Sequence, residues 1–152
     1  MSYQDKFYKS KESNFFYKRV MKNYKIQNGL RENKKEILEH LRKNIKLDKK
    51  KVLEIGCFIG DLLFTLKKEY NCKVNGVEPS SLACKFAHNK FNLKVENTTF
   101  ARSKKFNMSK TYKNYYDLII VDDVLSWMDR SLILQTISSI DSMLKTGGYI
   151  FL

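Results

Sequence analysis

After residue 51 the hydrophobic pattern alternates between short apolar runs and longer segments with helical spacing. The apolar runs predict strands at 52–55, 73–78, 93–96, 117–122 and 149–152. Helices are predicted at 61–70, after the capping residue Ser80, and at 131–144, where Gly147 and Gly148 end the pattern. Residues 101–115 are polar and predict a loop. Strands separated by helices indicate βαβ units, so we expect an α/β fold with a parallel sheet.

Two further helical patterns precede this region. Phe16, Val20 and Tyr24 share a helical face, and residues 31–45 predict a second amphipathic helix. We treat 1–30 as an N-terminal helical segment and 31–152 as the main domain. The N-terminal segment is rich in Lys and aromatic residues, beginning with Tyr3, Phe7 and Tyr8. It either forms a lid over an active site or packs on the sheet.

The inward face of the last predicted helix follows from its apolar spacing. The side chains expected to point into the core are Leu132, Ile133, Ile137, Ile140 and Leu144.

Candidate chemistry begins between the first strand and its helix, in the segment 54–60. Ligands of open α/β sheets bind at the carboxyl ends of the strands. Gly56 and Gly60 allow a tight turn and a close approach of the backbone to a ligand. Glu78 ends the second strand, 24 residues after Glu54, where an acidic side chain can accept hydrogen bonds from both ribose hydroxyls.

The end of the fourth strand carries a pair of carboxylates, Asp122 and Asp123. They are candidates for a general base, and the alternative is that they cap the loop entering the next helix. Trp127 either faces a substrate or fills the core. Cys57 has no nearby His, so a small buried residue is favoured over a nucleophile.

Four ordered motifs resemble those of class I S-adenosylmethionine-dependent methyltransferases. They are 52–57 with Gly60, 77–80, 116–120 and 144–148, and the resemblance covers about residues 35–152. It implies a three-layer Rossmann-like fold comprising strands one to five of the seven-stranded methyltransferase sheet, with N-terminal helices. It also implies S-adenosyl-L-methionine as the cofactor and assigns cofactor-binding roles to Glu54, Gly56, Cys57, Gly60, Glu78, Pro79, Ser80, Thr98 and Asp122.

By this resemblance, Glu54, Gly56 and Gly60 line the methionine and ribose portion, and a side chain at Gly60 would intrude on the cofactor. Glu78 holds the ribose, Pro79 and Ser80 lie beside the adenine, and 97–99 flanks its edge. Asp122 lies near the methionine end.

Two departures from the family pattern stand out. Phe58 replaces the middle glycine of the usual triplet, so its side chain must point away from the cofactor. The sequence ends within the fifth strand, which is consistent with a truncated reading frame, a decayed gene or a protomer completed by a partner. An unpaired apolar edge strand also predicts that the chain is either marginally stable or self-associates.

The net charge of +13 suggests nucleic acid as a partner, but only five of the 29 basic residues are Arg. The basic residues are also spread along the chain and do not gather on one face. We therefore favour a solvated basic surface. No apolar segment reaches the roughly 20 residues of a membrane span, and no signal core opens the chain. Three Cys without CxxC spacing indicate reduced thiols, no metal site and a cytoplasmic location.

The predicted function is S-adenosylmethionine-dependent methyl transfer to a small molecule, with glycan or metabolite precursors as candidates. DNA amino-methylases carry a Pro-Pro-aromatic signature where this chain has Asp122-Asp123-Val124-Leu125. Two alternatives remain: a non-catalytic or decayed cofactor-binding protein, and an RNA methyltransferase recruited by phosphate contacts.

Overall fold

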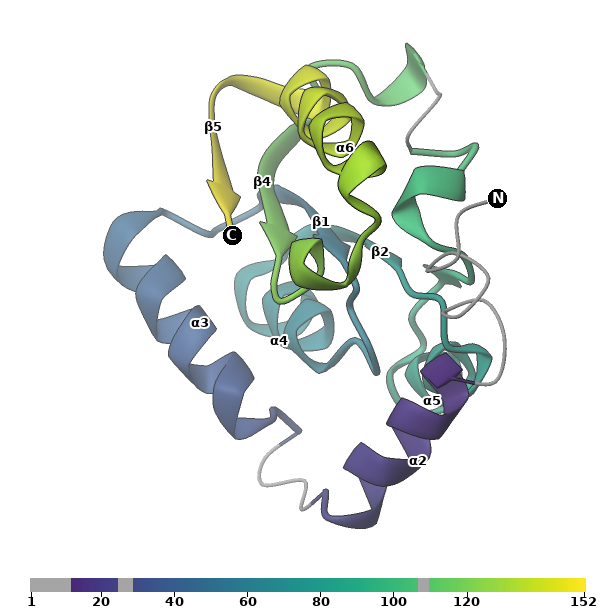
Figure 1. Cartoon of the computed structure of the whole chain (residues 1–152). Helices are drawn as coiled ribbons and strands as arrows, with labels where there is room; N and C mark the ends of the chain where they lie inside the picture. The colour runs from purple at the N-terminus through teal and green to yellow at the C-terminus, as the bar shows by residue number, and fades with distance from the viewer. Residues whose placement is uncertain (1–11, 25–28, 107–109) are drawn as a thin grey trace.

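A parallel five-stranded sheet forms the centre of the computed structural model, which describes residues 12–24, 29–106 and 110–152. The order of the described strands is β3-β2-β1-β4-β5 (Figure 1). Their bounds are Lys51–Ile55 for β1, Lys73–Val77 for β2, Val95–Glu96 for β3, Tyr116–Val121 for β4 and Leu144–Phe151 for β5. The predicted α/β class and parallel sheet are confirmed.

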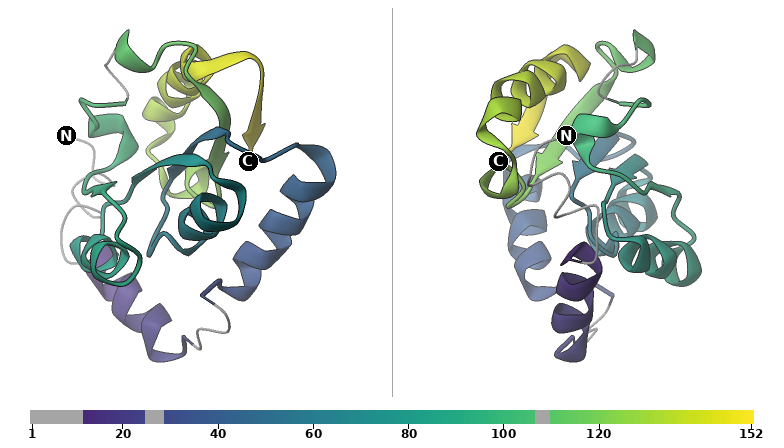
Figure 2. Two further views of the ribbon diagram at one scale, coloured as in Figure 1. Left: turned by 180° about the vertical axis from the view of Figure 1, so that it is seen from behind. Right: turned by 45° about the vertical axis from the view of Figure 1, so that its right-hand side comes forward.

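Helices cover both faces of the sheet and complete a three-layer Rossmann-like fold (Figures 1 and 2). They are α2 (Ser13–Lys22), α3 (Glu32–Asn44), α4 (Asp61–Tyr70), α5 (Ser81–Phe91) and α6 (Arg130–Met143). No helix within residues 12–24, 29–106 and 110–152 is long and apolar enough to cross a membrane.

A hydrophobic core lies on each face of the sheet, and a central strand contributes side chains to both cores because successive side chains point to opposite faces. On β1, Val52 packs with Leu41 of α3 and Leu62 of α4, whereas Leu53 packs on the other face with Ile140 of α6. Both strand residues are fully buried. This two-sided burial explains why β1 and β4 are apolar along their length.

The end of the chain differs from the prediction. Helix α6 stops at Met143, and β5 starts at Leu144, opposite Tyr116. Gly147 and Gly148 therefore lie inside the strand, within a bulge that Gly147 permits through its φ of +74°. The predicted inward face of α6 was wrong at Ile137, which is 41% exposed, while Thr136 is buried.

Two smaller differences concern the segment around β3. The predicted strand at 93–96 is reduced to two residues, and Leu93 packs in the core before it begins. The predicted loop at 101–115 contains the short 3₁₀ helices η2 (Phe100–Arg102) and η3 (Lys110–Tyr112). Phe106 is buried and packs in the hydrophobic cluster that also contains Ile140 and Met143 of α6.

We expect the 152-residue chain to self-associate through β5, which forms the outer edge of the described sheet. Tyr149 and Ile150 are 49% and 40% exposed there, next to unpaired backbone groups. Light scattering after size-exclusion chromatography should show a mass that rises with concentration. Ile150→Lys should remove the effect because a charged edge opposes strand pairing. A strictly monomeric parent chain would contradict the expectation.

Candidate functional site

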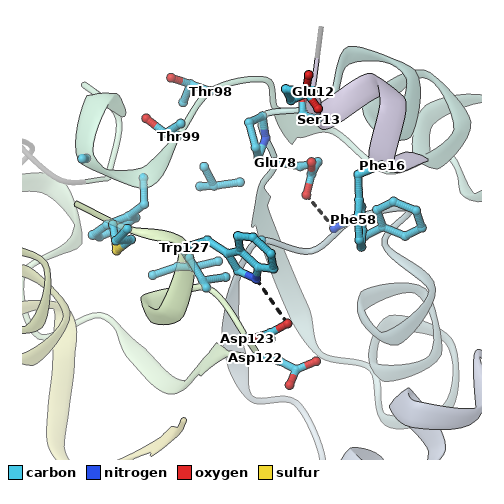
Figure 3. A pocket seen from close by; sticks show the side chains of 18 of the residues that line it. Glu12, Ser13, Phe16, Phe58, Glu78, Thr98, Thr99, Asp122, Asp123 and Trp127 are labelled. Carbon is cyan, nitrogen blue, oxygen red and sulfur yellow. Dashed lines mark hydrogen bonds between the residues drawn. The ribbon is translucent and has the colours of Figure 1, made fainter. Parts of the chain in front are cut away.

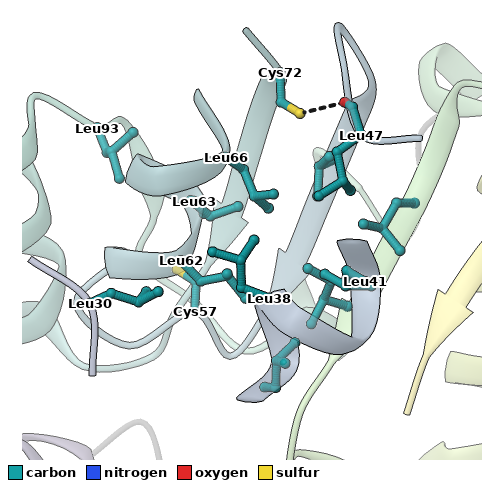
Figure 4. Close-up of a cluster of buried hydrophobic side chains, with 14 of the residues drawn as sticks. Leu30, Leu38, Leu41, Leu47, Cys57, Leu62, Leu63, Leu66, Cys72 and Leu93 are labelled. Atoms are coloured by element: carbon teal, nitrogen blue, oxygen red, sulfur yellow. Dashed lines mark hydrogen bonds between the residues drawn. The ribbon is translucent and has the colours of Figure 1, made fainter. Parts of the chain in front are cut away.

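A pocket with a volume of about 430 Å³ opens at the carboxyl ends of β1, β2 and β4 (Figure 3). This is the edge of the sheet where α/β proteins bind ligands. The first turns of α2 and the segment 127–132 complete its walls. The predicted site residues that line it are Gly56, Glu78, Pro79, Thr98, Asp122 and Asp123.

Other predicted site residues lie behind the pocket wall. Glu54 and Cys57 are fully buried, Ser80 is nearly so, and none of them lines the pocket. Burial raises the pKa of the Cys57 thiol well above its usual value, which opposes a nucleophilic role. The structure thus separates residues that a ligand could touch from residues that support them.

Gly56 and Gly60 lie in the glycine loop, residues 56–60 between β1 and α4, and they have different neighbours. Both have a φ of +74°, which favours glycine. A Cβ on Gly56 would collide with Val124, another residue of the pocket wall. A Cβ on Gly60 would instead lie 2.8 Å from Leu93 and 3.5 Å from Ala87, in the core. The expectation that a side chain at Gly60 would intrude on a ligand was therefore wrong; it would disturb packing.

Glu78 connects the glycine loop to the start of α5. Its Oε2 accepts a hydrogen bond from the Phe58 N–H at 2.9 Å, and its Oε1 accepts one from the Ser80 N–H at 2.8 Å. The side chain points into the pocket although it is only 6% exposed (Figure 3). This burial raises the pKa of Glu78 to about 7, against the opposing effect of the two hydrogen bonds.

The ring of Phe58 lies beneath α2. It contacts the rings of Phe16 and Tyr17 with centroid distances of 5.7 and 5.8 Å, and the Arg31 guanidinium lies 4.8 Å from its centre. Phe58 itself adopts a φ of +52°. The residue that departs from the family's glycine pattern therefore joins the loop to the N-terminal helix.

Helix α2 both packs on the domain and contributes to the pocket. Oδ1 of Asn14 accepts hydrogen bonds from the Ser80 hydroxyl at 2.9 Å and the Leu82 N–H at 3.1 Å. On the next turn Phe16 and Arg19 reach the pocket. Residues 13–22 therefore pack on the domain and also line the pocket, and a role as a lid stays a prediction. Tyr3, Phe7 and Tyr8 lie outside the described residues.

A buried ion-pair network supports the pocket floor, and sequence reasoning missed it. Nζ of Lys34 donates to Oε1 of Glu54 at 2.8 Å and to Oδ2 of Asp122 at 3.0 Å. Lys34 is 2% exposed. A signal was available, because Lys34 stands three residues before Ile37 and seven before Leu41, on the apolar face of α3.

A second buried pair lies beside the first. Arg31 binds both carboxylate oxygens of Asp61, at 2.9 Å each, through a bidentate contact. Its backbone N–H also donates to Asp61 at 2.8 Å. These contacts fasten the start of α3 to the start of α4, directly under the glycine loop.

The two carboxylates at the end of β4 differ in their partners. Asp122 is bound to Lys34, whereas Asp123 accepts hydrogen bonds from the Ser126 hydroxyl at 2.7 Å and the Trp127 ring N–H at 3.4 Å. Asp123 has a φ of +52°. Its contacts are those of the loop-capping alternative, and a role as general base stays a prediction. Trp127 is 53% exposed and lines the pocket, so it does not fill the core.

A family model described as "Methyltransferase domain" matches residues 53–150. The matched range contains the strands β2, β3 and β4 in full, most of β1 and β5, the glycine loop and Glu78. The chain belongs to this methyltransferase family. The resemblance seen in the four sequence motifs is thereby confirmed.

Solved methyltransferases share the fold. An S-adenosylmethionine-dependent methyltransferase from Archaeoglobus fulgidus is 26% identical with a TM-score of 0.60, over 77% of this chain and 51% of its own length. Magnesium protoporphyrin IX methyltransferase from Synechocystis PCC 6803 is 17% identical with a TM-score of 0.69, over 95% and 73%. A methyltransferase from Thiobacillus denitrificans, in complex with S-adenosyl-L-homocysteine, is 16% identical with a TM-score of 0.61, over 89% and 53%.

The methyltransferase chain thus spans between about half and three quarters of the length of these relatives. A comparison with curated proteins finds no match.

Proposed function

We propose that this domain binds S-adenosyl-L-methionine and transfers its methyl group to a small-molecule acceptor. The observation that carries the proposal is the position of Glu78, a nearly buried carboxylate pointing into a pocket at the ends of β1, β2 and β4. A carboxylate there can accept hydrogen bonds from a ribose diol. Gly56 lines the same pocket, where a Cβ would collide with the side chain of Val124.

The residues present fit this cofactor. Each Glu78 oxygen accepts one backbone hydrogen bond and keeps a lone pair for a ribose hydroxyl. Pro79 and Thr98 line the wall next to Glu78 and would hold the adenine. Asp122, fixed by Lys34, would face the methionine end.

When bound, S-adenosylmethionine supplies an electrophilic methyl group on a positively charged sulfur. The protein would contribute position and the exclusion of water more than acid–base chemistry. Phe16 of α2 lines the pocket and supports the proposal of a small-molecule acceptor. The pocket volume of about 430 Å³ supports the same proposal.

Calorimetric titration with S-adenosylhomocysteine tests cofactor binding directly. Transfer of a labelled methyl group to a panel of small acceptors then tests catalysis. We expect both. Binding without transfer to any acceptor class would favour the non-catalytic alternative, and the absence of binding would contradict the proposal.

We expect the affinity for S-adenosylhomocysteine to rise about tenfold between pH 6 and pH 8. Burial places the pKa of Glu78 at about 7, so the acceptor carboxylate is about one-tenth ionised at pH 6 and about nine-tenths ionised at pH 8. Titrations at several pH values measure this slope. Glu78→Ala should flatten it, and a slope that survives in this variant would contradict the assignment.

A further inference from the structure

The pocket carries negative charge within a strongly basic protein. The whole chain has 29 basic against 16 acidic residues, a net charge of +13. Among the described residues of the pocket lining the balance is reversed, with five carboxylates against three cations. The carboxylates belong to Glu12, Glu78, Asp122, Asp123 and Asp129, and the cations to Arg19, Arg31 and Lys34.

Two of these cations are already neutralised by carboxylates outside the pocket lining. Arg31 is held by Asp61, and Lys34 is held by Glu54 as well as by Asp122. Arg19 is the remaining cation of the described lining. Its side chain is exposed on the surface of α2, and its guanidinium lies 5.5 Å from the centre of the Phe16 ring. A cationic ligand therefore meets more carboxylates than cations in the described lining, although the protein as a whole is basic.

The cofactor accounts for only part of this charge. S-adenosylmethionine carries one net positive charge, and its proposed contacts are with Gly56, Glu78, Pro79 and Thr98, with Asp122 at the methionine end. Figure 3 shows Asp123 and Trp127 together on the other side of the pocket, away from Thr98. This second wall is left for the acceptor.

The second wall combines a carboxylate with exposed aromatic rings. Trp127 is 53% exposed, the rings of Phe15 and Phe16 on α2 are 61% and 44% exposed, and all three residues line the pocket. The Asp123 carboxylate is oriented by the hydroxyl of Ser126 at 2.7 Å and the ring N–H of Trp127 at 3.4 Å. Aromatic faces and carboxylates both attract an organic ammonium group.

Resting on the function proposed above, we propose that the methyl acceptor is an amine with an apolar or aromatic body, bound as its ammonium ion by Asp123 and Trp127. The rings of α2 would cover the apolar body. Nucleic acids and carboxylate acceptors would be repelled by the same lining. Asp123 thereby acts as a specificity-determining residue.

Before transfer, the bound ammonium must lose one proton, which Asp123 can accept and pass to water. The freed nitrogen lone pair then forms the new N–C bond, and the electron pair of the broken S–C bond returns to sulfur. The products are the methylated ammonium ion, S-adenosylhomocysteine and the proton released to water.

The test uses three probes of nearly the same shape: benzylamine, benzyl alcohol and benzoate. Each is titrated at pH 7.5, by ligand-observed NMR, into the full chain saturated with S-adenosylhomocysteine. We expect benzylamine to bind roughly tenfold or more tightly than benzyl alcohol, and benzoate most weakly, because the pocket charges attract the first and repel the last. Labelled methyl transfer should follow the same order.

Asp123→Asn is the decisive variant, since Asn tolerates the positive φ of this position. It should remove the preference for benzylamine, while the affinity for S-adenosylhomocysteine should stay within about twofold of the parent value. Asp141→Asn, at an exposed position of α6, is the control and should change neither. Intact S-adenosylhomocysteine binding without any preference for the amine would overturn this inference alone. Loss of S-adenosylhomocysteine binding by the parent chain would overturn the proposed function and the inference with it.

Discussion

Lys34→Met is expected to lower the free energy of unfolding by about 3–5 kcal/mol. Lys34 is 2% exposed and neutralises Glu54, which is fully buried. Oε2 of Glu54 has no hydrogen-bond partner among the described residues. Removing the cation leaves Glu54 as an uncompensated buried charge. Urea denaturation, followed by circular dichroism, measures the loss.

The neighbouring lysine provides a matched control. Lys35 pairs with Glu32 at 2.7 Å, but both side chains are exposed to solvent, at 35% and 81%. Lys35→Met should change stability by less than about 0.5 kcal/mol. The double variant Lys34→Met/Glu54→Met should recover much of the lost stability, because it replaces both charges with apolar side chains. Equal effects of Lys34→Met and Lys35→Met would show that the network adds no stability.

Glu78→Ala is expected to weaken the binding of S-adenosylhomocysteine by about 10- to 100-fold. Hydrogen bonds to a charged acceptor contribute about 1.5–3 kcal/mol, and about 1.4 kcal/mol corresponds to one decade of affinity. Part of the loss could come from the backbone groups of Phe58 and Ser80, which also depend on this carboxylate. Calorimetric titration measures the total.

The 2′-deoxyribose analogue of S-adenosylhomocysteine separates the two contributions. The parent protein should bind the analogue more weakly than the natural ligand, whereas Glu78→Ala should bind both alike. A purely structural role for Glu78 would leave the discrimination intact and weaken both ligands equally. Glu69→Ala, at an exposed position of α4, should bind both ligands as the parent does.

The hydrophobic pattern and the glycines were sufficient to predict the central strands and the part of the pocket that contains Gly56 and Glu78. Strands buried on both faces need apolar residues throughout, so β1 and β4 could be located from their composition. The turn after β1 needs positive φ, which pointed to Gly56. Glu78 followed from its place at the end of β2. Each of these requirements acts within a few residues of chain.

The limits of local pattern are visible at β5. A Gly-Gly pair after a helical segment is a common helix terminator, so the strand was predicted to start after it. Pairing with Tyr116 instead draws Leu144 into the sheet and turns the glycines into a bulge. The competing interaction comes from a strand far away in the sequence.

The sequence by itself determined the class of fold, the family and the edge of the sheet where the pocket lies. Only the tertiary structure decided which polar residues face the pocket and which support it. Lys34, Glu54 and Asp122 come from α3, β1 and the end of β4, and their mutual neutralisation exists only once these elements pack. The same holds for the pocket lining to which Trp127 and the rings of α2 contribute, because the meeting of distant segments leaves no periodic trace in the chain.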